Sequence, residues 1–311
     1  MIELCNVSKD FGPTPAVSDF SLKIESGAFF VLIGPSGCGK STVLRMINAM
    51  IVPDKGHIEV RGENIRAMEP EKLRRGIGYV IQSAGLFPHW TAADNILAVP
   101  HLLKWSPSKC AARLDALVTM VGIEAALLER YPKQLSGGQQ QRIGVARALA
   151  ADPDIILMDE PFAALDPVSR VALQEELRGI HARSGKTIVF VTHDMDEALR
   201  LATGMAVMNN GRLIQAGTPA SILLAPADDF VRDFLGGESL QLRLLDLVPV
   251  RKLMKPGNAR ATGTIAAEAS LKAALNLMLA RRCASLGVEG ERGARLGEIH
   301  LSDIIARRDA S

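Results

Sequence analysis

The sequence predicts an α/β fold organised around a mostly parallel sheet. Two short apolar runs at 29–33 and 155–158 have the length and composition of buried strands, and the stretch 168–181 has the periodicity of a helix. The run 29–33 leads directly into a Gly-rich turn that opens another helix. Strands that alternate with helices usually pair in parallel, because each helix returns the chain to the same end of the sheet.

Composition supports an ordinary folded protein. The chain has 311 residues, of which 48% are hydrophobic and 23% are charged, which argues against a disordered chain, a collagen-like repeat or a coiled coil. This length favours two domains, or one large domain with an appendage. A net charge of +2 is too balanced to indicate a nucleic-acid surface, so we expect no nucleic-acid partner.

Neither a membrane span nor a disulfide framework is predicted. No apolar run reaches the roughly 18 residues that a membrane-spanning helix needs. The first residues lack the basic start and apolar stretch of a signal peptide, so we expect the chain to stay in the cytoplasm. The four cysteines lie far apart and form no C-x-x-C pair, which favours free thiols.

The order of the elements places a helical region in the middle of the chain. Seven segments have the apolar composition or the alternation of strands: 2–7, 21–24, 29–33, 57–60, 77–81, 155–158 and 187–191. The alternation at 57–60 indicates an edge strand. From 91 to 150 the pattern is helical, as at 109–120, which predicts a helical subdomain at about 83–150 between two strands.

The tail differs from the rest of the chain. All thirteen aromatic residues fall between Phe11 and Phe234, so a core in the last 77 residues depends on aliphatic side chains. The flexible pair Gly236-Gly237 suits a linker, and we place the boundary there, giving domains 1–235 and 236–311. The tail is predicted to contain a helix at 270–282 and a hairpin at 284–301.

A phosphate-binding loop directly follows the strand at 29–33. Residues 34–41 fit G-x-x-x-x-G-K-[ST] and open a helix, which is the context that the motif requires. Successive N–H groups and the helix N-terminus attract phosphates. We expect Lys40 to reach the β and γ phosphates and Ser41 to ligate Mg²⁺. The expected nucleotide contacts here are Gly34, Pro35, Ser36, Gly37, Cys38, Gly39, Lys40, Ser41 and Thr42.

A second phosphate cradle follows in the helical region. Residues 135–139 read Leu-Ser-Gly-Gly-Gln and open a helix that offers N–H groups, a hydroxyl and a helix dipole. This string resembles the signature of the ATP-binding cassette (ABC) ATPases. The resemblance implies a head-to-tail dimer of two copies that sandwiches two ATP molecules, each signature facing the other copy's phosphate loop. It assigns nucleotide contacts to Ser136, Gly137, Gly138 and Gln139.

Two acids end the strand at 155–158, where a parallel sheet places magnesium-handling groups. They match the acid pair of the ABC family, which implies that Asp159 holds Mg²⁺ through water and that Glu160 is the general base. Ala164, Leu165 and Asp166 stand at the spacing of the family's D-loop. The resemblance implies that Asp166 organises the partner's site.

Four more residues take roles from the same resemblance. Gln82 matches the Q-loop glutamine, which senses Mg²⁺ and water, and His193 matches the switch histidine that contacts the γ-phosphate. Phe11 matches an aromatic that stacks on adenine, with Val17 beside it, and a plain core position for Phe11 is the alternative. The implied catalytic residues are Lys40, Gln82, Glu160 and His193, and the implied metal ligands are Ser41, Gln82 and Asp159.

The resemblance covers about residues 1–235. It implies a P-loop NTPase (RecA-like) core with an inserted helical subdomain and an antiparallel β subdomain. It also implies an ATPase that drives a separate membrane permease from the cytoplasmic face of the inner (cell) membrane, with a substrate-binding protein acting indirectly. Leu86, Phe87 and Trp90 are the expected docking surface for the permease, and a place in the core of the helical subdomain is the alternative.

The subfamily and the tail suggest what the cassette drives. Residues 77–96 and 131–170 are similar to importers of osmoprotectants such as glycine betaine and choline. An importer of another small solute and a soluble ABC ATPase are the alternatives. Parts of 248–304 resemble one CBS repeat, an α+β unit that usually works in pairs. A second copy could complete the pair, and a regulatory and a dimerisation role both stay open.

Overall fold

A computed structural model of the chain describes residues 1–12, 14–163, 165–237, 243–257, 263–290 and 293–306. The chain divides into two compact units, 1–219 and 220–311. Two short helices, α9 (Pro219–Leu224) and α10 (Asp229–Phe234), lie between this division and the predicted boundary at Gly236-Gly237. The boundary at Gly236-Gly237 therefore stays a prediction.

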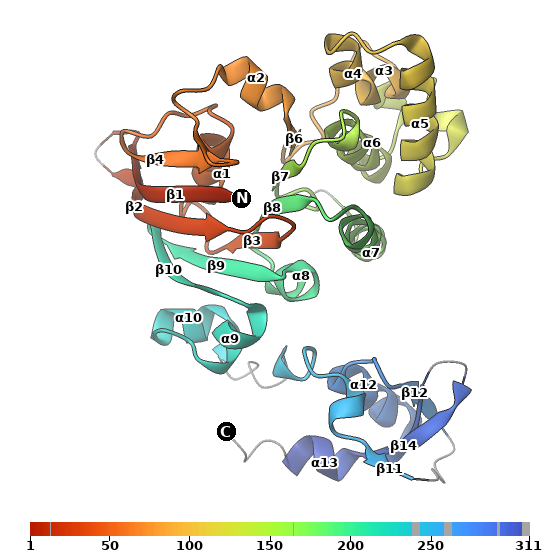
Figure 1. The fold of residues 1–311 in the computed structure, drawn as a ribbon. Coiled ribbons are helices and arrows are strands. Elements are labelled where there is room, and N and C mark those ends of the chain that lie inside the picture. Colours follow the sequence, from red (N-terminus) through yellow and green to blue (C-terminus); the bar gives the residue numbers. More distant parts are fainter. Residues whose placement is uncertain (13, 164, 238–242, 258–262, 291–292, 307–311) are drawn as a thin grey trace. The chain divides into compact units, whose positions relative to one another are not determined.

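The centre of the first unit is a six-stranded sheet in the order β10-β9-β3-β8-β7-β6 (Figure 1). Neighbouring strands from β9 to β6 are parallel, and only β10 runs antiparallel to β9. Every residue of β3, β7 and β8 is buried, as is typical of parallel strands covered on both faces. The predicted, mostly parallel α/β sheet is confirmed. The strands are β3 (Phe29–Ile33), β6 (Ile77–Val80), β7 (Ile155–Asp159), β8 (Thr187–Thr192), β9 (Gly204–Asn209) and β10 (Arg212–Gly217).

A second sheet of the first unit is antiparallel, with the order β2-β1-β4-β5. Its apolar side chains alternate along β1 and join the same core as those of β3. The prediction of an edge strand at 57–60 is wrong, because β4 pairs with β1 on one side and with β5 on the other. Alternation marks a half-buried face and does not distinguish an edge from an inner strand. The strands are β1 (Ile2–Asp10), β2 (Pro15–Ile24), β4 (Lys55–Val60) and β5 (Glu63–Asn64).

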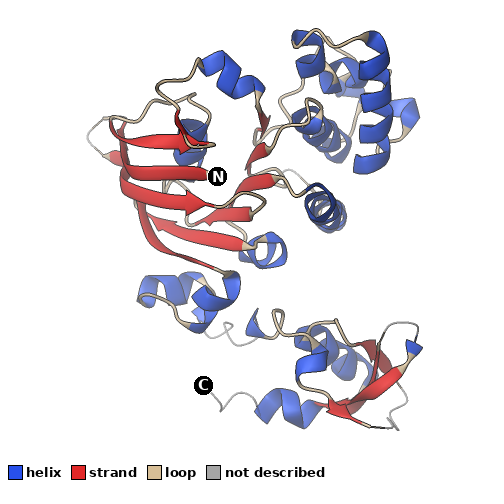
Figure 2. Cartoon of the chain, in the orientation of Figure 1, coloured by secondary structure: helices blue, strands red, loops and turns tan. Residues whose placement is uncertain are grey.

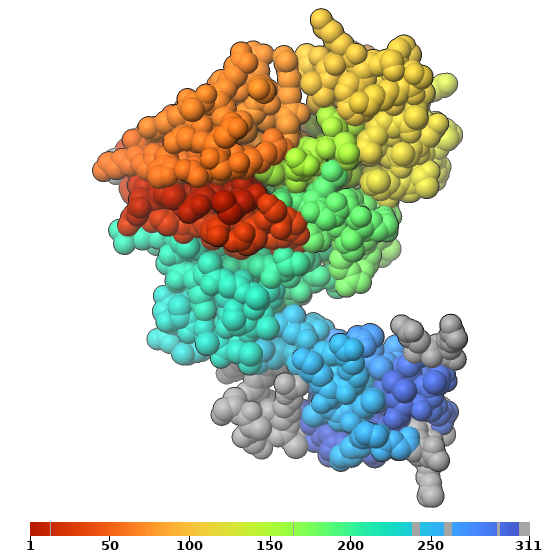
Figure 3. Space-filling view, in the orientation of Figure 1, coloured from red at the N-terminus to blue at the C-terminus, as the bar shows by residue number. Residues whose placement is uncertain are grey.

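The helical region is an insertion into a single crossover. Strands β6 and β7 are parallel neighbours, yet the chain between them forms four helices and two short 3₁₀ turns before it returns. Figure 3 shows residues of this region, in yellow, as a lobe beside the orange residues. The helices are α3 (Ala92–Ile96), α4 (Ala98–Leu102), α5 (Pro107–Val121) and α6 (Gly137–Leu149), and the turns are Ala125–Leu127 and Pro132–Gln134.

The remaining helices of the first unit connect strands of its two sheets. Helix α1 follows the phosphate-binding loop, and α7 lies between β7 and β8 in the chain. These helices are α1 (Lys40–Ile47), α2 (Pro70–Arg75), α7 (Pro167–Ser184) and α8 (Met195–Leu201). Among the described residues, no helix combines the length and apolar character needed to cross a bilayer.

The second unit contains a small α+β layer (Figure 2). Its sheet has the order β11-β14-β13-β12, in which β12 and β13 are parallel and the other pairs are antiparallel. Its core is aliphatic, with Leu271, Leu286 and Ile299 fully buried, as the absence of aromatics from the tail requires. The elements are β11 (Lys255–Pro256), β12 (Thr264–Ala266), α12 (Leu271–Arg281), β13 (Ser285–Glu289), β14 (Arg295–His300) and α13 (Leu301–Ala306).

Candidate functional site

The phosphate-binding loop joins the end of β3 to the start of α1, and two of its glycines are required by close packing. Gly34 has a φ of 158° and Gly39 a φ of 102°. A Cβ at Gly34 would collide with the carbonyl of Met208, and one at Gly39 would collide with the carbonyl of Ala16. The Gly211 N–H also donates to the Cys38 carbonyl over 3.1 Å. The loop therefore lies tightly against β2, β9 and the turn after β9, with its shape determined by backbone contacts.

Lys40 and Cys38 lie inside this loop. The Lys40 ammonium donates to the carbonyls of Gly34 and Pro35, each at 2.8 Å, and lies 3.7 Å from the Cys38 Sγ. Cys38 is buried, and this burial raises the pKa of its thiol although the Lys40 charge lowers it. Of the other loop residues, Ser36 and Gly37 are exposed, and Pro35, Ser41 and Thr42 are half-buried.

Ser41 and Asp159 form the contact between the loop and β7. The Ser41 hydroxyl donates to Asp159 Oδ1 over 2.7 Å. The Arg45 guanidinium lies 3.8 Å from Oδ2 of the same carboxylate. Burial raises the pKa of Asp159, while Ser41 and Arg45 oppose that rise. Arg45 was not predicted; its position one helical turn after Ser41, at i+4, is the sequence signal that places both on one face of α1.

Glu160 brings together residues from three strand ends. Its backbone has a φ of 44°, in the left-handed region, and its N–H donates to the Val191 carbonyl over 3.0 Å. Gln82 Nε2 donates to Glu160 Oε2 at 3.5 Å, and His193 Nδ1 lies 3.3 Å from the same oxygen. A left-handed conformation in a residue other than glycine is a strained feature that is often found at functional sites.

The signature and the D-loop aspartate lie in helix N-caps. Ser136 caps α6 by accepting from the Gln139 N–H, while the Gln139 side chain accepts from the Ser136 N–H. Asp166 caps α7 by accepting from the N–H groups of Val168 and Ser169. Hydrogen bonding by the Ser169 side chain, and then by these N–H groups, lowers the pKa of Asp166. Within the described residues, no hydrogen bond joins 136–139 or Asp166 to the phosphate-binding loop. Ala164 lies outside the described residues.

Phe11 and Val17 occupy different environments. Phe11 is 62% exposed, so the alternative of a plain core position is wrong, and the Lys9 ammonium lies 5.4 Å from its ring centre. Val17 is fully buried, and its Cγ2 is 3.4 Å from the position of a Cβ at Gly39. A fully buried side chain offers no surface to a nucleotide. Val17 instead packs against the phosphate-binding loop at Gly39.

The loop that follows Gln82 exposes aromatic side chains. Phe87 and Trp90 are 48% and 42% exposed, with ring centres 4.5 Å apart, and Leu86 is half-buried. The exposure of both rings argues against a place in the core of the helical region. The loop is held from inside by Asn95, which is fully buried and was not predicted from the sequence. Its amide exchanges hydrogen bonds with the Phe87 backbone and donates to the Trp90 carbonyl.

Comparisons with known proteins show the family of the chain. The family model described as ABC transporter matches residues 17–163. The glycine betaine uptake system ATP-binding protein YehX of Escherichia coli (strain K12) is 51% identical over 98% of this chain and 99% of its own. The choline transport ATP-binding protein OpuBA of Bacillus subtilis (strain 168) is 48% identical over 98% of this chain and 79% of its own.

Solved structures give the same result for the fold. A bacterial ABC transporter cassette solved as a dimer has a TM-score of 0.65 and 34% identity, covering 70% of this chain and 98% of that chain. A post-hydrolysis cassette bound to ADP and Pi has a TM-score of 0.64 and 33% identity over the same shares.

The fold and the site together define an ATP-binding P-loop ATPase with an inserted helical region. The chain belongs to the ATP-binding cassette (ABC) transporter family and is an ATP-hydrolysing subunit.

Proposed function

We propose that two copies of this chain close around two Mg²⁺-bound ATP molecules and that hydrolysis powers import of a quaternary-ammonium osmoprotectant through a separate permease. The observation that carries the ATPase assignment is the meeting of Gln82 and His193 on one oxygen of Glu160. Because this carboxylate lies next to Asp159, the base and the metal-binding acid share one edge of the sheet. We propose that the chain works at the cytoplasmic face of the cell membrane.

In this proposal Glu160 takes the proton of the attacking water. Gln82 and His193 hold Oε2 of Glu160 in one orientation, so the carboxylate is preorganised before the reaction. Because His193 directs Nδ1 at Glu160, its Nε2 is the ring atom that would contact the γ-phosphate of a bound nucleotide. Lys40 moves its ammonium from the loop carbonyls to the β and γ oxygens of the nucleotide, which offer full charge in place of a dipole.

Mg²⁺ fits the oxygen donors at this edge. The Ser41 hydroxyl and the Asp159 carboxylate are hard donors that already lie within hydrogen-bond distance of each other, and Gln82 is the third ligand we assign. Held by these residues, Mg²⁺ would neutralise the negative charge that develops on the phosphate oxygens during hydrolysis. Mg²⁺ commonly uses only one or two carboxylates together with phosphates and water, so a larger acidic cluster is not needed.

The signature and Asp166 complete the site of a second copy. The N-terminal turn of α6 presents N–H groups and a helix dipole, which suit a phosphate. The dimeric state of the solved cassettes supports this arrangement for the present chain. Phe11 is exposed and is the residue we assign to stacking on adenine.

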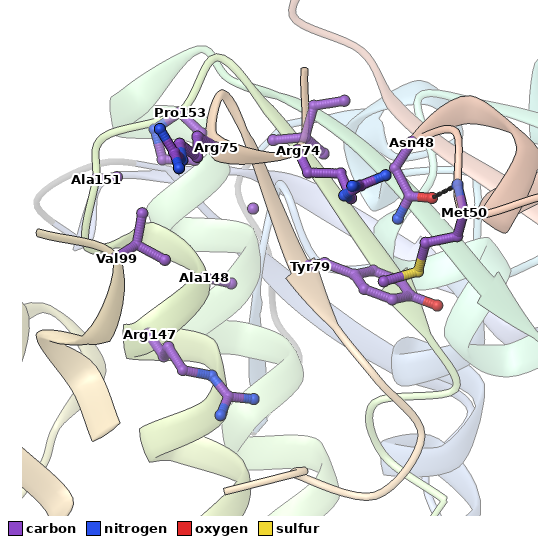
Figure 4. Close-up of a pocket in the computed structure, with 12 residues that line it drawn as sticks. Asn48, Met50, Arg74, Arg75, Tyr79, Val99, Arg147, Ala148, Ala151 and Pro153 are labelled. Carbon is purple, nitrogen blue, oxygen red and sulfur yellow. Dashed lines mark hydrogen bonds between the residues drawn. The ribbon is translucent and has the colours of Figure 1, made fainter. Parts of the chain in front are cut away.

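The permease is proposed to dock beside Gln82. A groove of about 800 Å³ there is lined by Arg45, Met50, Tyr79 and Gln82 among others. A neighbouring cavity of about 200 Å³ shares Met50 and Tyr79 (Figure 4). In the close-up, the Met50 N–H donates to the Asn48 side chain. The exposed Phe87 and Trp90 add an apolar surface that a permease segment would cover.

The cargo is inferred from the relatives. Their names state uptake or transport of glycine betaine, carnitine or choline, which all carry a quaternary ammonium group. A binding protein with an aromatic cage would hold such a group through cation–π contacts. A second candidate is a polyamine, because spermidine/putrescine import proteins such as PotA of Nitrosomonas eutropha (strain DSM 101675 / C91 / Nm57) are 45% identical over 76% of this chain.

Uptake by the complete transporter tests this assignment. The chain, its permease and its binding protein are reconstituted in vesicles with ATP on the side of this chain, and uptake of glycine betaine, choline, carnitine and spermidine is measured. We expect ATP-dependent uptake of at least one quaternary amine and no uptake by the Glu160→Gln transporter. Uptake of spermidine alone would replace the osmoprotectant by a polyamine.

The tail at 236–311 is proposed to be one CBS-like repeat that pairs with the same segment of a second copy. Its β12-α12-β13-β14-α13 order supports this proposal. Leu279 and Leu296 are exposed on α12 and β14 and provide apolar surface for such pairing.

A further inference from the structure

Arg170 lies at a junction between two loops of the site. It belongs to the first turn of α7, and its N–H donates to the Asp166 carbonyl over 2.9 Å. Its Nη2 donates to the carbonyl of Leu165 at 3.3 Å. On the other side, Nη1 lies 3.7 Å from Asp194 and Nε lies 3.9 Å from Glu197. One guanidinium therefore contacts both the D-loop segment and the segment that carries His193.

The acceptors on the histidine side hold the residues next to His193. The Thr192 hydroxyl donates to Glu197 Oε2 at 2.6 Å and accepts from the Asp194 N–H at 3.0 Å. Glu197 is 5% exposed, and burial raises its pKa. Gln174 also donates to Glu197, at 3.3 Å. Arg170 supplies compensating charge to this buried carboxylate and to Asp194, so a displacement of Arg170 changes the environment of Thr192 and Asp194.

The contacts of Arg170 leave room for a second arrangement. Its Nε is buried and, among the described residues, has no hydrogen-bond partner. The 3.9 Å separation from Glu197 becomes a hydrogen bond after a movement of less than about 1 Å. The planar guanidinium bridges several oxygen acceptors at fixed angles, which an ammonium group does not.

We propose that Arg170 is a positioning residue that couples the D-loop segment 165–166 to the His193 loop of the same chain. Closure of the dimer moves Asp166, and Arg170 transmits that movement to His193 and so to Glu160. The inference rests on the proposed roles of Asp166 and His193 and adds a link between the partner's site and the chain's own site.

The test compares four variants in the full-length protein. Arg170→Met removes the guanidinium, and Arg178→Met on the same helix is the matched control, because Arg178 is 59% exposed and pairs with Glu175 one turn away. We expect Arg170→Met to lower kcat about tenfold to hundredfold, with KM and ATP affinity within about twofold of wild type. The dependence of rate on ATP should lose its cooperativity. Arg178→Met should match wild type.

Arg170→Lys and His193→Ala make the outcome decisive. Lysine keeps the positive charge but lacks the planar guanidinium with its several donors, so Arg170→Lys should recover only part of kcat. If Arg170→Met does not fold, Arg170→Lys is the variant that tests the proposal. An Arg170 variant with wild-type kcat and cooperativity, beside an inactive His193→Ala, would overturn the coupling alone. A loss of kcat that is matched by a loss of ATP affinity would also overturn it. Full turnover by His193→Ala would overturn the proposed role of His193, and with it this inference.

Discussion

His193 Nδ1 lies 3.3 Å from Glu160 Oε2, the same oxygen that accepts a hydrogen bond from Gln82. The three residues follow β8, β7 and β6, which are neighbours in the central sheet. Because these strands are parallel, their carboxyl ends lie at one edge, and residues about 80 and 30 positions apart along the chain meet there. Strand order therefore assembles the candidate site.

Replacement of Glu160 by glutamine tests the general base. The amide keeps the shape of the side chain but does not accept a proton from water, so turnover should fall by about 10²-fold or more while ATP affinity changes little. Phosphate release and nucleotide binding measure the two effects. Glu175→Gln on α7, which changes an exposed carboxylate, is the control. Sustained hydrolysis by Glu160→Gln would show that another group is the base.

Replacement of Asp159 by asparagine separates function from stability. The pKa of Asp159 is raised by burial, so the native state binds its proton more readily than the unfolded chain does. Its ionised form therefore costs stability at neutral pH, and this cost disappears as the pH falls through the native and then the ordinary pKa. We expect Asp159→Asn to melt a few degrees higher than wild type at pH 7 without Mg²⁺, and the difference to shrink in acid. Its hydrolysis should need more Mg²⁺.

An unchanged or lower melting temperature for Asp159→Asn at pH 7 would contradict this account. Asp154→Asn, which changes an exposed aspartate before the same strand, is the control for the loss of a negative charge.

A bulky thiol reagent should block ATP binding through Cys38, and ATP should protect the thiol. Cys38 is buried in the phosphate-binding loop, and the raised pKa of its thiol makes labelling slow at neutral pH and faster as the pH rises. Mass spectrometry follows labelling and fluorescence follows nucleotide binding. Cys38→Ala should bind ATP after the same treatment, which excludes effects at Cys5, Cys110 and Cys283. Normal ATP binding by protein labelled at Cys38 would show that the loop geometry is wrong.

Truncation of Phe87 and Trp90 to alanine should weaken the permease complex without affecting the ATPase of the free chain. Large side chains at the centre of an interface often contribute about 1–4 kcal/mol each, so the double variant should no longer co-purify with the detergent-solubilised permease. Leu102→Ala changes a side chain of similar exposure in the same helical region and should co-purify normally. Retention of the complex by Phe87→Ala/Trp90→Ala would place the docking surface elsewhere.

The contiguous motifs were the most predictable part of the site. The phosphate-binding loop, the signature and the acid pair each keep their chemistry within a few neighbouring residues, so their residue types and spacing identify them. Arg170 and Asn95 were not predictable in this way, because their partners lie in other segments and an isolated arginine or asparagine has no distinctive pattern. The burial of Val17 also came only from the structure, since a valine in a strand faces either side.

The sequence by itself determined the class of chemistry, the mostly parallel sheet and the aliphatic composition of the tail. Local patterns determine these properties, because a Gly-rich loop, a strand period and a residue composition depend only on neighbours along the chain. Only the tertiary structure decided that β4 lies inside its sheet, that Glu160 is held by Gln82 and His193, and that Arg170 links two loops. These depend on which strands pair and which helices pack, and such contacts join residues far apart in the sequence.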